Sequence, residues 1–218
     1  MGSVDEVILH RYAATMSDAE VHVPHLGPAF DDALVYASNA HRSQTRKASG
    51  IVPYVSHLLG VASLVIEEGG TETQTIAALL HDAVEDQGGL LRLDEIRDRF
   101  GSSVADIVEA CTDSTEVPKP DWRPRKETYL AHLPSAPPDA LLVSVADKVH
   151  NARSILKDLR SGGVAMFQRF TGGRDGTLWY YRSLVTIYRS IAGFDSRLID
   201  ELDRTVTKIE ALASDPPP

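Results

Sequence analysis

The stretch that decides the fold of this chain is residues 77–86, which read Ala77-Ala78-Leu79-Leu80-His81-Asp82-Ala83-Val84-Glu85-Asp86. Its apolar first half has the pattern of a buried helix, and four ionisable groups follow at its end. On a helix, Glu85 lies one turn beyond His81, and Asp86 lies one turn beyond Asp82. The four groups therefore form a compact cluster where the helix leaves the core, and such a cluster indicates a metal and acid/base site.

Two further segments end an apolar helical pattern in polar residues that can bind a metal or a phosphate. They are Ala40-His41-Arg42-Ser43-Gln44-Thr45-Arg46-Lys47 and Val143-Ser144-Val145-Ala146-Asp147-Lys148-Val149-His150-Asn151-Ala152-Arg153. The apolar residues between Pro28 and Gln44 recur with helical spacing, and His41 continues their inward face. Residues 140–159 are long enough for one helix with Asp147 near its middle.

The rest of the chain also shows helical periodicity and no clear strand alternation, which predicts an all-α fold. Three prolines mark residues 112–124 as a surface loop that could fold over a pocket. We expect a loosely ordered N-terminal segment at 1–25 and one compact helical domain at 26–214. Further helices are predicted at about 56–68, 73–84, 93–100, 104–111, 177–191 and 196–212.

The composition narrows the class of protein. A chain of 218 residues with 43% hydrophobic residues can bury a full core. Its net charge of −9 argues against nucleic-acid binding, which depends on clustered Lys and Arg. Cys111 is the only cysteine, which excludes an intramolecular disulfide and a thiolate zinc site. No apolar run suits a membrane span and no signal peptide is evident, so we expect a cytoplasmic protein without a membrane partner.

His41, His81, Asp82 and Asp147 supply two imidazoles and two carboxylates from three predicted helices. This set suits a divalent ion of intermediate hardness, such as Mn²⁺, Fe²⁺ or Zn²⁺. The alternative reading is core histidines and surface acids that pair with Arg or Lys, and it is favoured for each residue taken singly. Taken together they favour a metal, because Asp147 lies in an apolar stretch where a buried carboxylate needs a counter-charge.

These segments resemble the HD-domain superfamily, and specifically the hydrolase domain of RelA/SpoT homologues and the small alarmone hydrolases. The matching motifs occur in the family's order over roughly residues 30–155. They are Ala40-His41 with Gln44 and Arg46-Lys47; Ser49-Gly50 with Pro53-Tyr54 and His57; Leu80 to Asp86; and Ala146-Asp147-Lys148 with His150-Asn151-Ala152-Arg153.

The resemblance implies an all-α HD-type helical bundle that holds one Mn²⁺, or another divalent ion, through His41, His81, Asp82 and Asp147. The implied substrate is a nucleotide, guanosine tetra- or pentaphosphate, whose 3′-pyrophosphate is removed to leave GDP or GTP. Further roles follow for polar residues beside the ligands. Glu85 and Asp86 would activate the attacking water, while the substrate would be bound by Arg46, Lys47, Asn151 and Arg153.

Two departures from the family pattern leave the base preference open. Ser144 stands where the family commonly has a lysine, and the loop after Lys47 is one residue longer than usual. Adenosine 3′-pyrophosphates and a broader HD-type nucleotide phosphohydrolase activity therefore stay as alternatives, as does a nucleotide-sensing domain without turnover. The presence of Glu85 and Asp86 with all four ligands favours an enzyme.

Three further groups of residues complete the expectations for the site. Arg125 and Lys126, beside the predicted loop, are candidates to receive the distal phosphates. His57 and His150 are expected in structural or outer-sphere roles, since four ligands leave little room. The aromatic run Leu178-Trp179-Tyr180-Tyr181 suits a core or dimer contact, so a homo-oligomer stays open.

Overall fold

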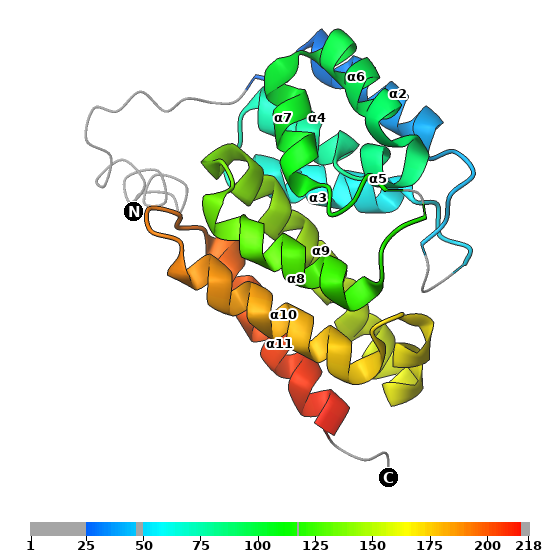
Figure 1. The fold of residues 1–218 in the computed structure, drawn as a ribbon, viewed down its shortest axis with the longest axis vertical. Helices are drawn as coiled ribbons and strands as arrows, with labels where there is room; N and C mark the ends of the chain where they lie inside the picture. The colour runs from blue at the N-terminus through cyan, green and yellow to red at the C-terminus, as the bar shows by residue number, and fades with distance from the viewer. Residues whose placement is uncertain (1–24, 47–49, 117, 215–218) are drawn as a thin grey trace, which may run out of the picture.

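The computed structural model describes residues 25–46, 50–116 and 118–214, which form a helical protein (Figure 1). Within these ranges no β-strand occurs, and Thr45 and Pro53 form an isolated bridge. The all-α prediction is confirmed. Of the predicted N-terminal segment, residues 1–24 lie outside the described ranges.

The helices are α2 (Pro28–Ala40), α3 (Val55–Glu67), α4 (Glu72–Leu80), α5 (Ala83–Gln87), α6 (Gly89–Phe100), α7 (Ser102–Cys111), α8 (Trp122–His132), α9 (Pro138–Gly162), α10 (Gly173–Ser190) and α11 (Arg197–Ser214), with short 3₁₀ helices η1 (Leu133–Ser135) and η2 (Gly163–Arg169).

The turn between α3 and α4 shows how local sequence sets the helix ends. Gly69 has a φ of +77°, a backbone conformation that glycine adopts without strain, and it ends α3 as its sequence predicts. Thr71 then caps α4, because its side chain accepts a hydrogen bond from the amide of Gln74 while the Gln74 side chain accepts one from the Thr71 amide. This reciprocal capping box fixes the start of the helix that leads to His81.

The central helix differs from its prediction, because it divides at His81 and Asp82 into α4 and α5. The His81 ring explains the break: its Nδ1 donates a hydrogen bond of 2.8 Å to the carbonyl of Ala78. That carbonyl belongs to the last turn of α4, where backbone oxygens lack partners within the helix. The side chain therefore ends the helix and is itself fixed by doing so.

Helix α8 is the main addition to the predicted elements. It begins at Trp122, inside the stretch 112–124 that the prolines marked as a loop. Pro124 lies in the first turn, where a missing backbone N–H costs no hydrogen bond. Residues 113–116 and 118–121 remain without regular structure beyond bends at Asp113 and Pro118.

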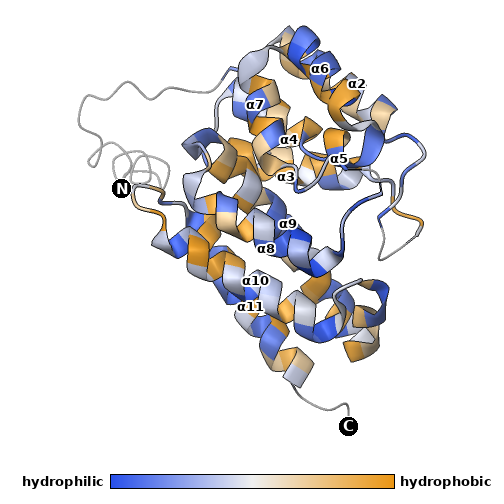
Figure 2. Cartoon of the chain, viewed as in Figure 1, coloured by the Kyte–Doolittle hydropathy of each residue, from blue (hydrophilic) through white to orange (hydrophobic). Residues whose placement is uncertain are grey.

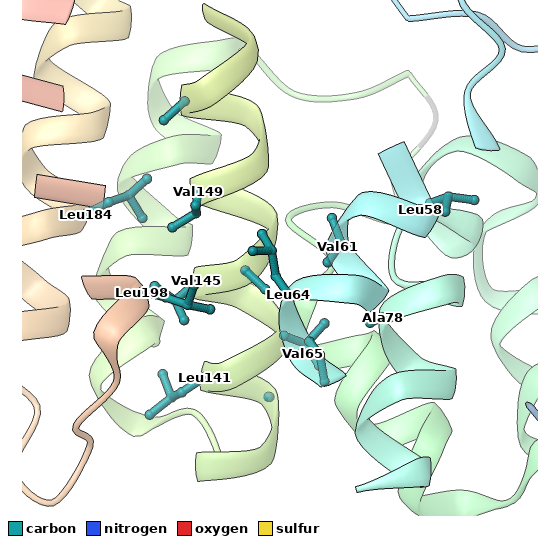
Figure 3. Close-up of a cluster of buried hydrophobic side chains, with 14 of the residues drawn as sticks. Leu58, Val61, Leu64, Val65, Ala78, Leu141, Val145, Val149, Leu184 and Leu198 are labelled. Carbon is teal, nitrogen blue, oxygen red and sulfur yellow. The ribbon is translucent and has the colours of Figure 1, made fainter. Parts of the chain in front are cut away.

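Helix α9 is the axis of the fold. It packs against α3, α4 and α7 on one side and against α10, α11 and η2 on the other (Figure 1). Figure 3 shows Val145 and Val149 of α9 between Leu64 of α3 and Leu184 of α10. Figure 2 shows that the helices contain both apolar and polar residues, and an amphipathic helix turns its apolar side chains towards the core. Among the described residues, no helix combines the length and apolar character needed to cross a bilayer.

Candidate active site

A buried cluster of imidazoles and carboxylates lies where α3, the α4–α5 junction and α9 meet. The Nε2 of His81 lies 3.1 Å from Asp82 and 3.6 Å from Asp147. The Nε2 of His57 lies 3.4 Å and 3.2 Å from the same two carboxylates. Both imidazoles are almost fully buried, with at most 3% of the side chain exposed. Of the described residues, His57, His81 and Asp147 form the group whose donor atoms all lie within 4.8 Å of one another.

Three histidines share one arrangement, in which Nδ1 is engaged and Nε2 is buried without a hydrogen-bond partner among the described residues. A histidine that binds a metal through Nε2 typically fixes its other nitrogen in this way. The orphaned Nε2 atoms therefore fit a cation. The Nδ1 contacts are His41 with Gln44 Oε1 at 2.7 Å, His81 with the Ala78 carbonyl at 2.8 Å, and His57 with His150 Nδ1 at 2.8 Å.

The two carboxylates of the cluster, Asp82 and Asp147, have strongly lowered pKa values. Burial alone would raise the pKa of Asp82, but the facing imidazoles of His81 and His57 outweigh it and hold this pKa well below its usual value. Burial would likewise raise the pKa of Asp147, and Lys148, at 2.5 Å, together with the imidazoles holds it low. Both carboxylates are therefore ionised at neutral pH, which is the form that coordinates a metal.

The position of His41 differs from that of the other two histidines. Its ring stacks on Tyr54 with the centroids 5.1 Å apart, and the Tyr54 hydroxyl donates a hydrogen bond of 2.5 Å to Asp82. Burial lowers the pKa of His41, so its ring is neutral at neutral pH. The structure thus places His41 beside Asp82, while His57, which the sequence placed in an outer role, has its Nε2 inside the cluster.

Glu85 and Asp86 lie at the edge of this cluster, as the helical spacing indicates. Lys119 donates to Glu85 at 2.8 Å and to Asp86 at 3.4 Å, and Gln44 donates to Asp86 at 2.8 Å. Burial raises the pKa of Glu85, and the nearby charges of Asp113 and Asp82 add to the effect. Lys119 is a site residue that the sequence did not reveal, because a lysine between two prolines reads as a solvated loop residue.

The motifs of the family resemblance supply four of the residues expected to bind substrate. Arg46 donates to Asn151 at 2.6 Å, and Asn151 donates to Asp147 at 2.5 Å, so both lie beside the cluster. Lys47 lies outside the described residues. Arg153 is not brought to the cluster, because its exposed guanidinium pairs with Glu201 of α11 at 2.5 Å.

Arg125 and Lys126 converge on Asp113 at the start of α8. Arg125 lies 2.6 Å and 2.7 Å from the two Asp113 oxygens and 3.4 Å from Glu85, and Lys126 contacts the same carboxylate. A cleft of about 600 Å³ opens beside Glu85, between the start of α6 and the segment containing Ser114 and Lys119. Part of the stretch 112–124, predicted as a loop that could fold over a pocket, therefore lines this cleft.

Comparisons with known proteins show which family the chain is similar to. The HD domain family matches residues 33–178. The chain is 40% identical over 126 residues to the guanosine-3′,5′-bis(diphosphate) 3′-pyrophosphohydrolase MESH1 of Xenopus tropicalis, which covers 57% of this chain and 68% of that protein. The Homo sapiens MESH1 protein is 38% identical over the same shares.

Two solved structures are similar in fold. One is described as a metazoan orthologue of SpoT that hydrolyses ppGpp; it has a TM-score of 0.69 and 26% identity, covering 84% of this chain and 97% of that one. The other comes from Listeria monocytogenes EGD-e, with a TM-score of 0.61 and 32% identity, covering 72% and 97%.

The helical fold and its buried histidine and aspartate cluster define an HD-type protein with a candidate metal centre. The chain belongs to the HD-domain family, on the branch of the guanosine-3′,5′-bis(diphosphate) 3′-pyrophosphohydrolases of the MESH1 type.

Proposed function

We propose that this chain is a metal-dependent hydrolase that removes the 3′-pyrophosphate from guanosine-3′,5′-bis(diphosphate) or its pentaphosphate counterpart. The products are GDP or GTP and pyrophosphate. One observation carries the proposal: the buried Nε2 atoms of His57 and His81, which have no hydrogen-bond partner in the part of the chain that the structure describes, face two ionised carboxylates. A second carboxylate pair, Glu85 and Asp86, lies next to them and can accept or donate a proton. The activities named for the MESH1 relatives support the choice of substrate.

The proposed metal ligands are His41, His81, Asp82 and Asp147, with Mn²⁺ as the expected cation and other divalent ions as alternatives. The residues fit such an ion, because His81 donates its Nδ1 proton to a backbone carbonyl and so directs the Nε2 lone pair towards the carboxylates. When bound, a divalent cation polarises a phosphoryl oxygen and lowers the pKa of a coordinated water.

Glu85 and Asp86 are the proposed acid/base residues. The raised pKa of Glu85 makes it a stronger base than an exposed carboxylate, which suits removal of a proton from water. The water oxygen forms a bond to the phosphorus next to the ribose, the bond from that phosphorus to O3′ breaks, and O3′ takes up a proton. Lys119 contacts both carboxylates and limits their freedom before substrate binds.

The substrate is proposed to bind through cations that now pair with acids or amides of the protein. Arg46 and Asn151 lie beside Asp147, and Lys47 is proposed as a further contact because it follows Arg46 in the sequence. Arg125 and Lys126 would exchange Asp113 for the distal phosphates, which offer the same oxygen geometry to a guanidinium. A cytoplasmic location and a function without nucleic acid remain predictions of the sequence.

Two variants separate metal binding from turnover. Asp82→Ala should abolish both the retention of Mn²⁺ and the hydrolysis of guanosine-3′,5′-bis(diphosphate). Glu85→Gln should keep the metal and lose activity by about 100-fold or more, the usual contribution of a general base. Glu95→Gln is the matched control, because the Glu95 carboxylate is 51% exposed, pairs with Arg92 and has no part in the proposed mechanism. A fully active Glu85→Gln protein would remove Glu85 from the mechanism.

A further inference from the structure

A contact between two histidine rings joins α3 to α9 behind the candidate metal centre. The Nδ1 of His57 lies 2.8 Å from the Nδ1 of His150, although the residues are 93 positions apart in the chain. The ring centroids are 4.8 Å apart and the planes are tilted by 53°. The helices carrying them pack side by side, and Leu64 of α3 lies against α9 in Figure 3.

Only one nitrogen of this pair can donate the hydrogen. A neutral imidazole carries one donor nitrogen and one acceptor nitrogen, and the partner at Nδ1 decides which form is present. If the Nδ1 of His57 donates, its Nε2 presents a lone pair to Asp82 and Asp147. His150 then does for His57 what the Ala78 carbonyl does for His81.

Gly60 provides the space in which the His150 ring lies. A Cβ atom at Gly60 would lie 2.3 Å from both Cδ2 and Nε2 of His150, far inside contact distance. Gly60 follows His57 by three residues on α3, so both face α9. A glycine inside a helix costs conformational entropy, and here its missing side chain leaves room for one ring.

We propose that His150 is a positioning residue, which accepts the Nδ1 proton of His57 and thereby presents the Nε2 of His57 to the metal centre, in a space that Gly60 supplies. His57 thus becomes a third imidazole facing Asp82 and Asp147. The inference rests on the metal centre of the proposed function. It adds His57 to that centre as a ligand, and His150 as the residue that orients His57.

Calorimetric titration of the metal-depleted full chain with Mn²⁺ tests the role of His150. His150→Ala should weaken Mn²⁺ binding by about 10- to 100-fold, as loss of a partner behind a ligand typically does. His150→Asn should keep most of the affinity, because the asparagine oxygen can accept a hydrogen bond near the Nδ1 position. Ser63→Ala, on the exposed face of α3, is the matched control and should bind as wild type does.

Gly60→Ala tests the space around the ring. In the wild-type background it should weaken Mn²⁺ binding, whereas in the His150→Ala background it should have little further effect, because the ring it displaces is gone. The free energy of unfolding of the metal-free proteins is measured in parallel. Loss of stability with unchanged Mn²⁺ affinity would mean that Gly60 and His150 only pack the helices, and would overturn the inference.

The outcomes separate this inference from the function on which it rests. A wild-type protein that binds no Mn²⁺ would overturn the metal centre itself. Tight binding by wild type together with equally tight binding by His150→Ala would overturn only the role of His150. Weak binding by His150→Ala with recovery in His150→Asn supports it.

Discussion

The buried carboxylate of Asp113 predicts a loss of stability on mutation, and the size of this loss follows from the shift of its pKa. Its side chain is 4% exposed and receives both the guanidinium of Arg125 and the ammonium of Lys126. Burial would raise the pKa of Asp113, but these two cations outweigh it and hold the pKa at about 2, against an ordinary value of 3.8. That difference corresponds to about 2 kcal/mol of stability at neutral pH. Asp113→Asn should therefore lower the free energy of unfolding at pH 7 by about that amount.

The lowered pKa of Asp113 also predicts how this difference in stability changes with pH. A carboxylate whose pKa is lower in the folded state stabilises the protein above its unfolded pKa, and this contribution is lost as the pH falls towards the folded value. The difference between wild type and Asp113→Asn should thus shrink below pH 4, to about half at pH 3. Urea unfolding followed by far-ultraviolet circular dichroism at both pH values measures it.

An exposed ion pair serves as the control for this experiment. Asp106 pairs with Arg97 at 2.7 Å, but its side chain is 62% exposed, so Asp106→Asn should change stability little at either pH. If Asp113→Asn were as stable as wild type at pH 7, or if its deficit were the same at pH 3 and pH 7, the assigned electrostatic role of Asp113 would be wrong.

Three further predictions concern packing and thiol reactivity. Leu79→Ala, at a fully buried position, should lower the free energy of unfolding by about 2 to 5 kcal/mol in urea titrations, and a loss below 1 kcal/mol would contradict its place in the core. Gly172→Ala should cost about 1 to 3 kcal/mol and change the tryptophan fluorescence, since the new Cβ would lie 2.6 Å from the Trp122 ring; an unchanged spectrum would argue against this contact. Partial burial raises the pKa of the Cys111 thiol to about 12, so iodoacetamide at pH 8 should modify the native protein more slowly than the urea-unfolded one, and equal rates would refute the raised pKa.

Most of the fold could be predicted because its helices carry regular apolar spacing and several of them end next to a glycine. The predicted helix at 140–159 corresponds to α9, and the Gly69-Gly70 stop corresponds to the end of α3. Helix α8 escaped prediction because Arg and Lys dominate its start and a proline occupies its first turn. The division of α4 from α5 depends on a side chain that bonds to the backbone, which spacing alone does not reveal.

The candidate site was predicted in part for a similar reason. His81, Asp82 and Asp147 stand at the ends or centres of apolar helical patterns, so their inward direction follows from periodicity. His57 contacts His150, which reaches it from another helix, and this pairing could not be read from the sequence spacing. Arg153 shares the motif that contains Asn151, but it lies on another face of α9 and pairs with Glu201. Contacts between distant segments such as these are set by the tertiary packing.

The most direct measurement is identification of the products released by the Mn²⁺-loaded full chain from guanosine-3′,5′-bis(diphosphate), with the adenosine 3′-pyrophosphate analogue in parallel. Hydrolysis at the 3′ position should give GDP and pyrophosphate in equal amounts, with neither formed after the metal is removed. Orthophosphate in place of pyrophosphate, an untouched guanosine substrate, or full activity without metal would contradict a metal-dependent 3′-pyrophosphohydrolase.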